Sequence, residues 1–195
     1  MPRKPTGPRL PDLPNGKLTA EQRGLRDAIM ASRGIKDAKL GGPFGVFLHA
    51  PAFGDIVQKL GEHCRYKTAL GPRLSEFSIL CIARFWRAQY EWFVHAPIAE
   101  KAGIAAKTIR DLQAGREPKA APKDEKAIYR FIAELYRKKR VSDRTYAAVH
   151  AFLNDAAMVE FVGIVGYYTL VAMELNVFRV PLPEGQKLPF REPAV

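Results

Sequence analysis

Apolar residues recur at helical spacing along most of the chain. The clearest stripe follows the i, i+3, i+4, i+7, i+8 pattern of an amphipathic helix. It consists of Ile128, Phe131, Ile132, Leu135 and Tyr136. We find no alternation of apolar and polar positions that is long enough to indicate a strand. The pattern therefore predicts an all-α protein.

Capping residues, prolines and glycines predict where the helices begin and end. Thr19 begins the sequence Thr-Ala-Glu-Gln, a capping box that predicts a helix running to about Arg33, where a glycine follows. Pro51 suits the first turn of a helix that reaches about Tyr66. The apolar segment 43–53 is expected to be a connector. Further helices are expected over 106–113, 142–154 and 156–178.

The segment 73–103 has a helical pattern throughout and is expected to form a hairpin of two antiparallel helices. The chain should turn back near residues 86–88, and Pro97 should kink the second arm or mark a short break. Glu76 and His95 lie nineteen residues apart in this segment. One unbroken helix would hold them about 28 Å apart, whereas the hairpin places them side by side.

Glu76 and His95 are candidates for proton-transfer chemistry. A carboxylate that orients an imidazole, with Tyr90 and Glu91 one turn away, is the minimum apparatus for general acid–base catalysis. Structural roles are the alternative. Glu76 can pair with an arginine of the same arm or occupy a first turn that the helix dipole favours, and His95 can be a structural hydrogen-bonding residue.

Aromatic and sulfur-containing side chains are further candidates. Tyr90 and Trp92 can line an aromatic substrate pocket, although aromatic residues at helical spacing more often belong to the core. Cys81 lies on an apolar stripe and is expected to be a buried, inert thiol, whereas Cys64 is expected to be more exposed. Neither belongs to a C-x-x-C pair. The histidines are too scattered to indicate a metal site, and no glycine-rich phosphate loop occurs.

The composition is that of one globular domain. The chain has 195 residues, of which 47% are hydrophobic and 26% are charged. We expect an extended N-terminal arm at 1–18, a single all-α domain at 19–183 and a loose tail at 184–195. No signal peptide is recognised, and the longest uncharged run, 161–173, is too short to span a bilayer. Two cysteines without secretion features suggest the cytoplasm.

The formal net charge of +11 raises the question of nucleic-acid binding. Lysines and arginines are spread over the N-terminal arm, 119–126 and 137–140, without a recognised nucleic-acid-binding motif. We therefore expect a solvated basic surface that attracts small anionic molecules, and neither a nucleic acid nor a membrane as a partner.

The segment 43–115 resembles the carboxymuconolactone decarboxylase family, which includes the alkylhydroperoxidase D-like proteins. The resemblance rests on RLSEFSIL, which contains Glu76, and on QYEWFVHAPIAEKAG, which contains His95 and Gly103. The remaining chain, with LGGPF and VGYYTL, is similar to the longer, single-hairpin members of the group. The resemblance implies a helical bundle that assembles into a homo-oligomer, either a trimer or a hexamer.

The resemblance also implies two possible chemistries. In the peroxidase branch, a glutamate, a C-x-x-C pair and a histidine form a proton relay. Its glutamate and histidine correspond to Glu76 and His95, but the cysteine positions correspond to Ala88 and Glu91. This chain therefore lacks the nucleophilic and resolving thiols of a peroxiredoxin-type antioxidant reaction. The decarboxylase branch requires neither a cysteine nor a cofactor.

The function that we expect is cofactor-free acid–base chemistry, of the decarboxylase or lyase type, on a small carboxylated or lactone substrate. In this hypothesis His95 donates a proton, Glu76 orients His95, and Glu91 is a second acid or base. Arg84 and Arg87 are possible anchors for the substrate carboxylate. Two alternatives remain open: a thiol-dependent antioxidant enzyme that uses one of the two cysteines, and a non-catalytic binding or scaffold protein.

Overall fold

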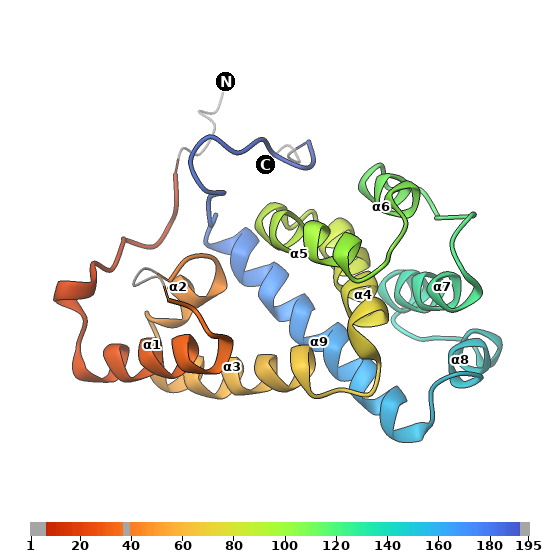
Figure 1. Ribbon diagram of the computed structural model, residues 1–195, viewed down its shortest axis with the longest axis horizontal. Helices are drawn as coiled ribbons and strands as arrows, with labels where there is room; N and C mark the ends of the chain where they lie inside the picture. The colour runs from red at the N-terminus through yellow and green to blue at the C-terminus, as the bar shows by residue number, and fades with distance from the viewer. Residues whose placement is uncertain (1–6, 37–39, 192–195) are drawn as a thin grey trace.

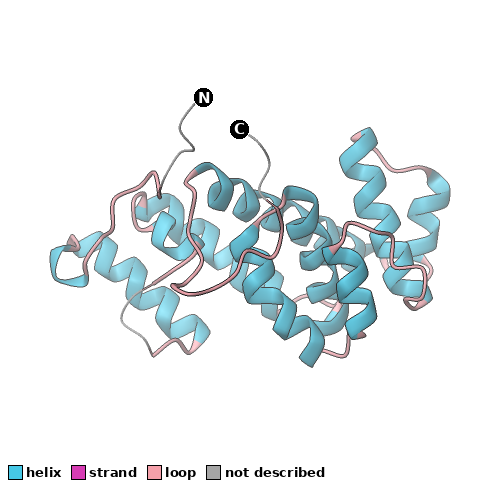
Figure 2. Cartoon of the chain, turned by 90° about the horizontal axis from the view of Figure 1, so that it is seen from above, coloured by secondary structure: helices cyan, strands magenta, loops and turns pink. Residues whose placement is uncertain are grey.

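The computed structural model describes residues 7–36 and 40–191. All the regular secondary structure in these two ranges is helical, so the all-α prediction is confirmed (Figures 1 and 2). In chain order the elements are η1 (Asn15–Lys17), α1 (Ala20–Arg33), α2 (Pro43–Phe47), α3 (Pro51–Tyr66), α4 (Gly71–Trp86), α5 (Gln89–Lys101), α6 (Ala106–Gln113), α7 (Lys123–Lys138), α8 (Asp143–His150) and α9 (Asp155–Val177).

Helix α4 lies at the centre of the bundle. It packs against α5, α7 and α9, while α1, α2 and α3 lie on one side of this centre and α6, α7 and α8 on the other (Figure 1). Because neighbours surround α4, every residue from 74 to 83 is buried, including Glu76. A helix that is covered on all sides is apolar around most of its circumference, and a carboxylate inside it needs a polar partner.

The predicted turn between the two central helices is confirmed. Arg87 has a φ of 50°, in the left-handed region, and it ends α4. The N–H of Ala88 donates to the carbonyl of Ala83 at 2.8 Å. Helix α5 then begins at Gln89 and continues through Pro97, so the short break considered for this proline is not present.

Local signals placed several helix ends correctly. The capping box of α1 is formed: the Thr19 hydroxyl accepts from the N–H of Gln22, and the Gln22 side chain accepts from the N–H of Thr19. The predicted helix over 142–154 was wrong at its end. Helix α8 stops at His150, and the Asn154 side chain caps α9 instead. The expected connector before α3 also contains the short helix α2.

Helix α9 is the long apolar helix near the C-terminus. By length and composition alone it is able to cross a bilayer, but 50% of its most apolar stretch is buried inside the protein. Its inner face packs on α4 and α3 and carries Tyr167 and Tyr168 into the interior. The prediction that this stretch is too short to span a bilayer was therefore wrong, because the helix extends beyond the uncharged run, but its burial is that of a core helix.

Both ends of the described chain contact the helical core. The N–H of Arg9 donates to the carbonyl of Phe178, and its guanidinium donates to the carbonyl of Val177. In the tail, Phe190 is buried against Trp92, with ring centroids 5.0 Å apart. The outermost part of each predicted segment lies outside the described residues. Within them, the composition of the arm and the tail did not indicate these contacts.

Candidate active site

The central hairpin brings Glu76 and His95 into contact. Nδ1 of His95 lies 2.7 Å from Oε2 of Glu76, and both side chains are buried. Since a carboxylate oxygen accepts, we assign the proton of this bond to Nδ1. Among the described residues, no protein group bonds to the other ring nitrogen, Nε2. Tyr168 fixes the ring from the side, in an edge-to-face contact with centroids 5.4 Å apart.

Glu91 lies one helical turn before His95, on the same face of α5. Its side chain is buried, and neither carboxyl oxygen has a hydrogen-bond partner among the described residues. Burial in apolar surroundings raises the pKa of Glu91 well above its ordinary value. Burial therefore favours the neutral, protonated form of Glu91, the form that can donate a proton.

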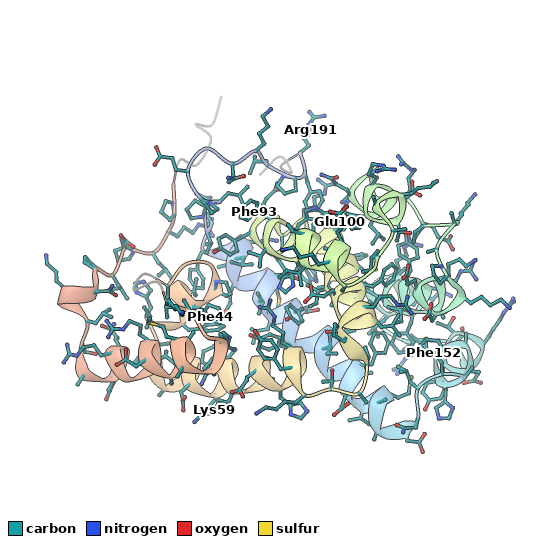
Figure 3. All side chains as sticks on the ribbon, in the orientation of Figure 1. Phe44, Lys59, Phe93, Glu100, Phe152 and Arg191 are labelled. Carbon is teal, nitrogen blue, oxygen red and sulfur yellow. The ribbon has the colours of Figure 1, made fainter. Side chains whose placement is uncertain are left out.

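Glu91 and His95 line one cavity of about 290 Å³. Its walls come from the ends of α1 and α3, from α2 and the loop before it, and from α5 and α9. Phe44, which is labelled in Figure 3, marks the α2 wall. Tyr90, Tyr167 and Tyr168 contribute aromatic surface. A largely apolar cavity with a few convergent polar groups is typical of small-molecule sites.

Two glycines allow the tyrosines to occupy this cavity wall. A Cβ at Gly61 would overlap the hydroxyl of Tyr167, and a Cβ at Gly42 would overlap the ring of Tyr90. Gly42 also has a φ of 62°, a backbone conformation that residues other than glycine rarely adopt. The backbone of α3 and of the loop before α2 therefore approaches the aromatic rings more closely than any other residue type would permit.

The sequence analysis did not predict the two arginines of the cavity wall, Arg33 and Arg65. The Arg33 guanidinium donates to the side-chain oxygen of Gln58 at 2.9 Å and to its carbonyl at 2.8 Å, and it lies over the ring of Phe44. Among the described residues, no carboxylate forms an ion pair with either arginine. Each arginine is close to the end of its helix, where a basic residue is common, so the sequence carried no signal of a shared cavity.

The other residues that were predicted to bind substrate lie elsewhere, except for Tyr90. Trp92 follows Glu91 by one residue and therefore points about 100° away from it around the helix. It packs against Phe190 and does not line the cavity. Arg84 donates to the carbonyl of Gln113 on the side of α6, and Arg87 is exposed in the turn after α4. We therefore do not place Trp92, Arg84 or Arg87 in this site.

Both cysteines are buried, and neither lines the cavity. The prediction that Cys64 is exposed was wrong, because it lies on the inward face of α3 with Val57 and Gly61. Burial raises the pKa of Cys64 to about 11 and that of Cys81 well above its ordinary value. Both are therefore thiols, not thiolates, at neutral pH, and both are weak nucleophiles.

A larger cleft of about 760 Å³ lies between the C-terminal segment and the turn after α4. It shares Tyr90 with the smaller cavity but contains none of the three acid–base residues. The smaller cavity is therefore the candidate active site despite its size. Within the ranges that the structure describes, no three His, Cys, Asp or Glu residues are grouped so that they could hold a metal ion.

The arrangement of the helices is that of the alkylhydroperoxidase AhpD core. A structure titled as an AhpD-core, uncharacterized peroxidase-related protein from Ralstonia eutropha JMP134 superimposes with a TM-score of 0.74. The two chains are 14% identical, over 91% of this chain and 93% of the other.

A second similar structure is an uncharacterized peroxidase-related protein from Silicibacter sp. TM1040. Its TM-score is 0.68 and its identity 12%, over 93% of this chain and 95% of the other. No protein-family model matches the chain, and no curated protein matches it in sequence. At these identities the likeness establishes the fold, and function has to be argued from the site.

Proposed function

We propose that the protein is a cofactor-free enzyme that acts by acid–base chemistry, of the decarboxylase or lyase type, on a small carboxylated or lactone substrate. One observation carries the proposal. Glu91 and His95 lie on the wall of one 290 Å³ cavity. Glu76 accepts a hydrogen bond from Nδ1 of His95 at 2.7 Å and is not part of the cavity wall. A neutral acid and a second proton carrier, held side by side in a small cavity, are the groups that such chemistry needs.

The proposed reaction gives each residue one role. The bond between the substrate carboxylate and the adjacent carbon breaks, carbon dioxide leaves, and the electron pair moves onto a neighbouring carbonyl oxygen as an enolate. The neutral Glu91 donates a hydrogen bond to that oxygen. Protonated His95 delivers the Nε2 proton to the carbon, and Glu76 holds the ring through Nδ1. A proton from water then restores His95.

The two cavity arginines support an anionic substrate. Arg33 is held in place by Gln58 and Phe44, and neither it nor Arg65 pairs with a carboxylate in the described chain. Guanidinium groups bind carboxylates through two parallel hydrogen bonds. In this proposal Arg33 and Arg65 replace Arg84 and Arg87 as the substrate anchors.

The test is the release of carbon dioxide from carboxylated lactones and from β-keto carboxylates. We expect His95→Gln to lower kcat by about 10²- to 10⁴-fold, the usual contribution of one general acid or base, with unchanged helix content by circular dichroism. Glu76→Gln should also lower kcat. The control is His150→Gln on the exposed side of α8, which should keep full activity. Turnover that is equal in His95→Gln and the wild type would contradict the proposal.

The competing function is a thiol peroxidase, because both similar structures are titled as peroxidase-related. The raised pKa of Cys64 and of Cys81 argues against it, and neither cysteine is part of the cavity lining. The discriminating measurement is organic hydroperoxide consumption with a dithiol reductant. Turnover that disappears when both cysteines are changed to serine would overturn the acid–base proposal. Tight binding of a carboxylate in the cavity without turnover would instead favour a binding protein.

A further inference from the structure

A third hollow, of about 220 Å³, lies where α4, α6 and α7 meet. It shares no lining residue with the candidate active site. Four arginines line it, from α4, from the turn after α4, from the loop after α6 and from α7; they are Arg84, Arg87, Arg116 and Arg137. No acidic residue is part of the lining. Arginines from four parts of the fold therefore line one small space.

Most of these guanidinium groups lack a counter-charge. Arg116 forms an ion pair with Asp111, but within the described ranges Arg84, Arg87 and Arg137 contact no carboxylate. Burial, together with the neighbouring charge of Arg87, lowers the pKa of Arg84. Neighbouring like charges repel each other, and an anion placed between them would relieve that repulsion.

Arg84 is held rigidly at the wall of the hollow. Its Nε donates to the carbonyl of Gln113 at 3.0 Å, and its guanidinium lies 5.1 Å from the ring centroid of Phe190. Gly115 has a φ of 73°, and a Cβ there would lie 2.5 Å from Nη2 of Arg84. The loop after α6 is therefore shaped around this guanidinium, whose terminal nitrogens have no hydrogen-bond acceptor among the described residues.

Helix-end electrostatics explain part of this arrangement but not all of it. Arg84 and Arg137 lie in the last turns of α4 and α7, where a cation is favoured by the helix dipole. That effect places one cation at each helix end. It does not require guanidinium groups from several elements to line the same hollow, nor does it explain the absence of acidic residues from that lining.

We propose that this hollow binds a small molecule that carries a phosphate group. Arg84 and the exposed side chains of Arg87 and Arg137 bind the phosphate oxygens, since guanidinium groups match phosphate geometry. Leu112 and Tyr129 offer apolar and aromatic surface to the remainder of the ligand. A volume of 220 Å³ limits that remainder to a few atoms beyond the phosphate. The proposal does not depend on the function proposed for the His95 cavity.

The test is isothermal titration calorimetry of the full chain with inorganic pyrophosphate at physiological ionic strength. We expect saturable binding by the wild type and binding weaker by about tenfold or more in the double variant Arg87→Gln/Arg137→Gln. Both side chains are exposed, so the variant should fold normally. In amide spectra, pyrophosphate should shift the signal of Gly115, and the double variant should lose that shift.

The matched control is Arg140→Gln/Arg144→Gln, which removes the same charge from two exposed positions outside the hollow. It should bind pyrophosphate as the wild type does. An equal loss in both double variants would show attraction by the net charge of +11 and would overturn the proposal. The proposal would also fail if pyrophosphate produced no saturable binding, or if succinate bound more tightly than pyrophosphate.

Discussion

Glu91 shows how much the environment of one residue adds to its identity. Its spacing from His95 marked it as a second acid or base, but a sequence cannot assign a protonation state. The structure buries both carboxyl oxygens without a partner in the described chain, and this burial raises the pKa of Glu91. In the proposed reaction the residue is therefore the proton donor, and Glu76 is the carboxylate that orients His95.

This burial predicts a pH dependence of stability that Glu91→Gln should remove. Below the ordinary carboxyl pKa, both the folded and the unfolded protein hold the proton, and pH has no effect through this group. As the pH rises above that value, only the unfolded state releases it, so the free energy of unfolding falls. We expect the variant to match the wild type near pH 4 and to be more stable near pH 8.

Urea unfolding between these two pH values measures the difference. The control is Glu100→Gln, on the exposed side of the same helix and labelled in Figure 3, which should leave the pH profile of the wild type unchanged. Parallel profiles for Glu91→Gln and the wild type would show that Glu91 is ionised in the folded protein.

Whole helices were predicted well where their ends carry local signals. The first helix begins at the capping box of Thr19, and α3 begins at Pro51, as predicted. The short helix α2 was missed because five residues are too few for a periodic pattern, and such a helix depends on its packing against α3 and α9. The end of α8 was missed because the apolar pattern continues into the Asn154 cap of the next helix.

The close approach of α3 and α9 gives a prediction about packing. Gly61→Ala should lower the free energy of unfolding by about 1–3 kcal/mol, because its Cβ must displace the hydroxyl of Tyr167. The displaced ring should also change the cavity and therefore KM. Chemical denaturation of the variant measures the loss.

Gly24→Ala is the matched control. Gly24 is also inside a helix, α1, but a Cβ there meets no atom within 4 Å. We expect this variant to be stabilised by about 0.5–1 kcal/mol. The same change in both variants would mean that the contact between Gly61 and Tyr167 is not tight.

At the scale of the whole molecule, most of one face of α9 is exposed in the described chain, although Leu170 packs partly against the core. The residues of this face follow one another at alternating steps of three and four positions, and all but one of them are exposed. The members are Ala156, Val159, Gly163, Gly166, Leu170, Met173 and Val177. This spacing is the seam of paired helices, and we propose that a second copy of the chain covers it. The homo-oligomer implied by the family resemblance thus has a testable location.

Light scattering after size-exclusion chromatography should give a mass that is a multiple of 21.8 kDa. Val159→Lys combined with Met173→Lys should shift the protein to the monomer, since burying two charges in an apolar seam is costly. Tyr146→Lys with Leu188→Lys, two exposed apolar residues outside the stripe, should leave the mass unchanged. A monomeric wild type, or a double variant with unchanged mass, would contradict this location.

The sequence by itself determined the helical class and most helix ends, and the predicted hairpin placed Glu76 beside His95, but the contact between the two side chains is seen only in the structure. Each of these predictions depends on local periodicity, on capping residues or on one short turn. The tertiary structure alone decided which residues share a cavity. Arg33 and Arg65 line the same cavity as His95 because α1 packs on α3, and α3 packs on α9 and α4. Trp92, Arg84 and Arg87 are not part of that cavity wall. Long-range packing also decided the raised pKa of Glu91, since burial by distant helices has no signature in the neighbouring residues.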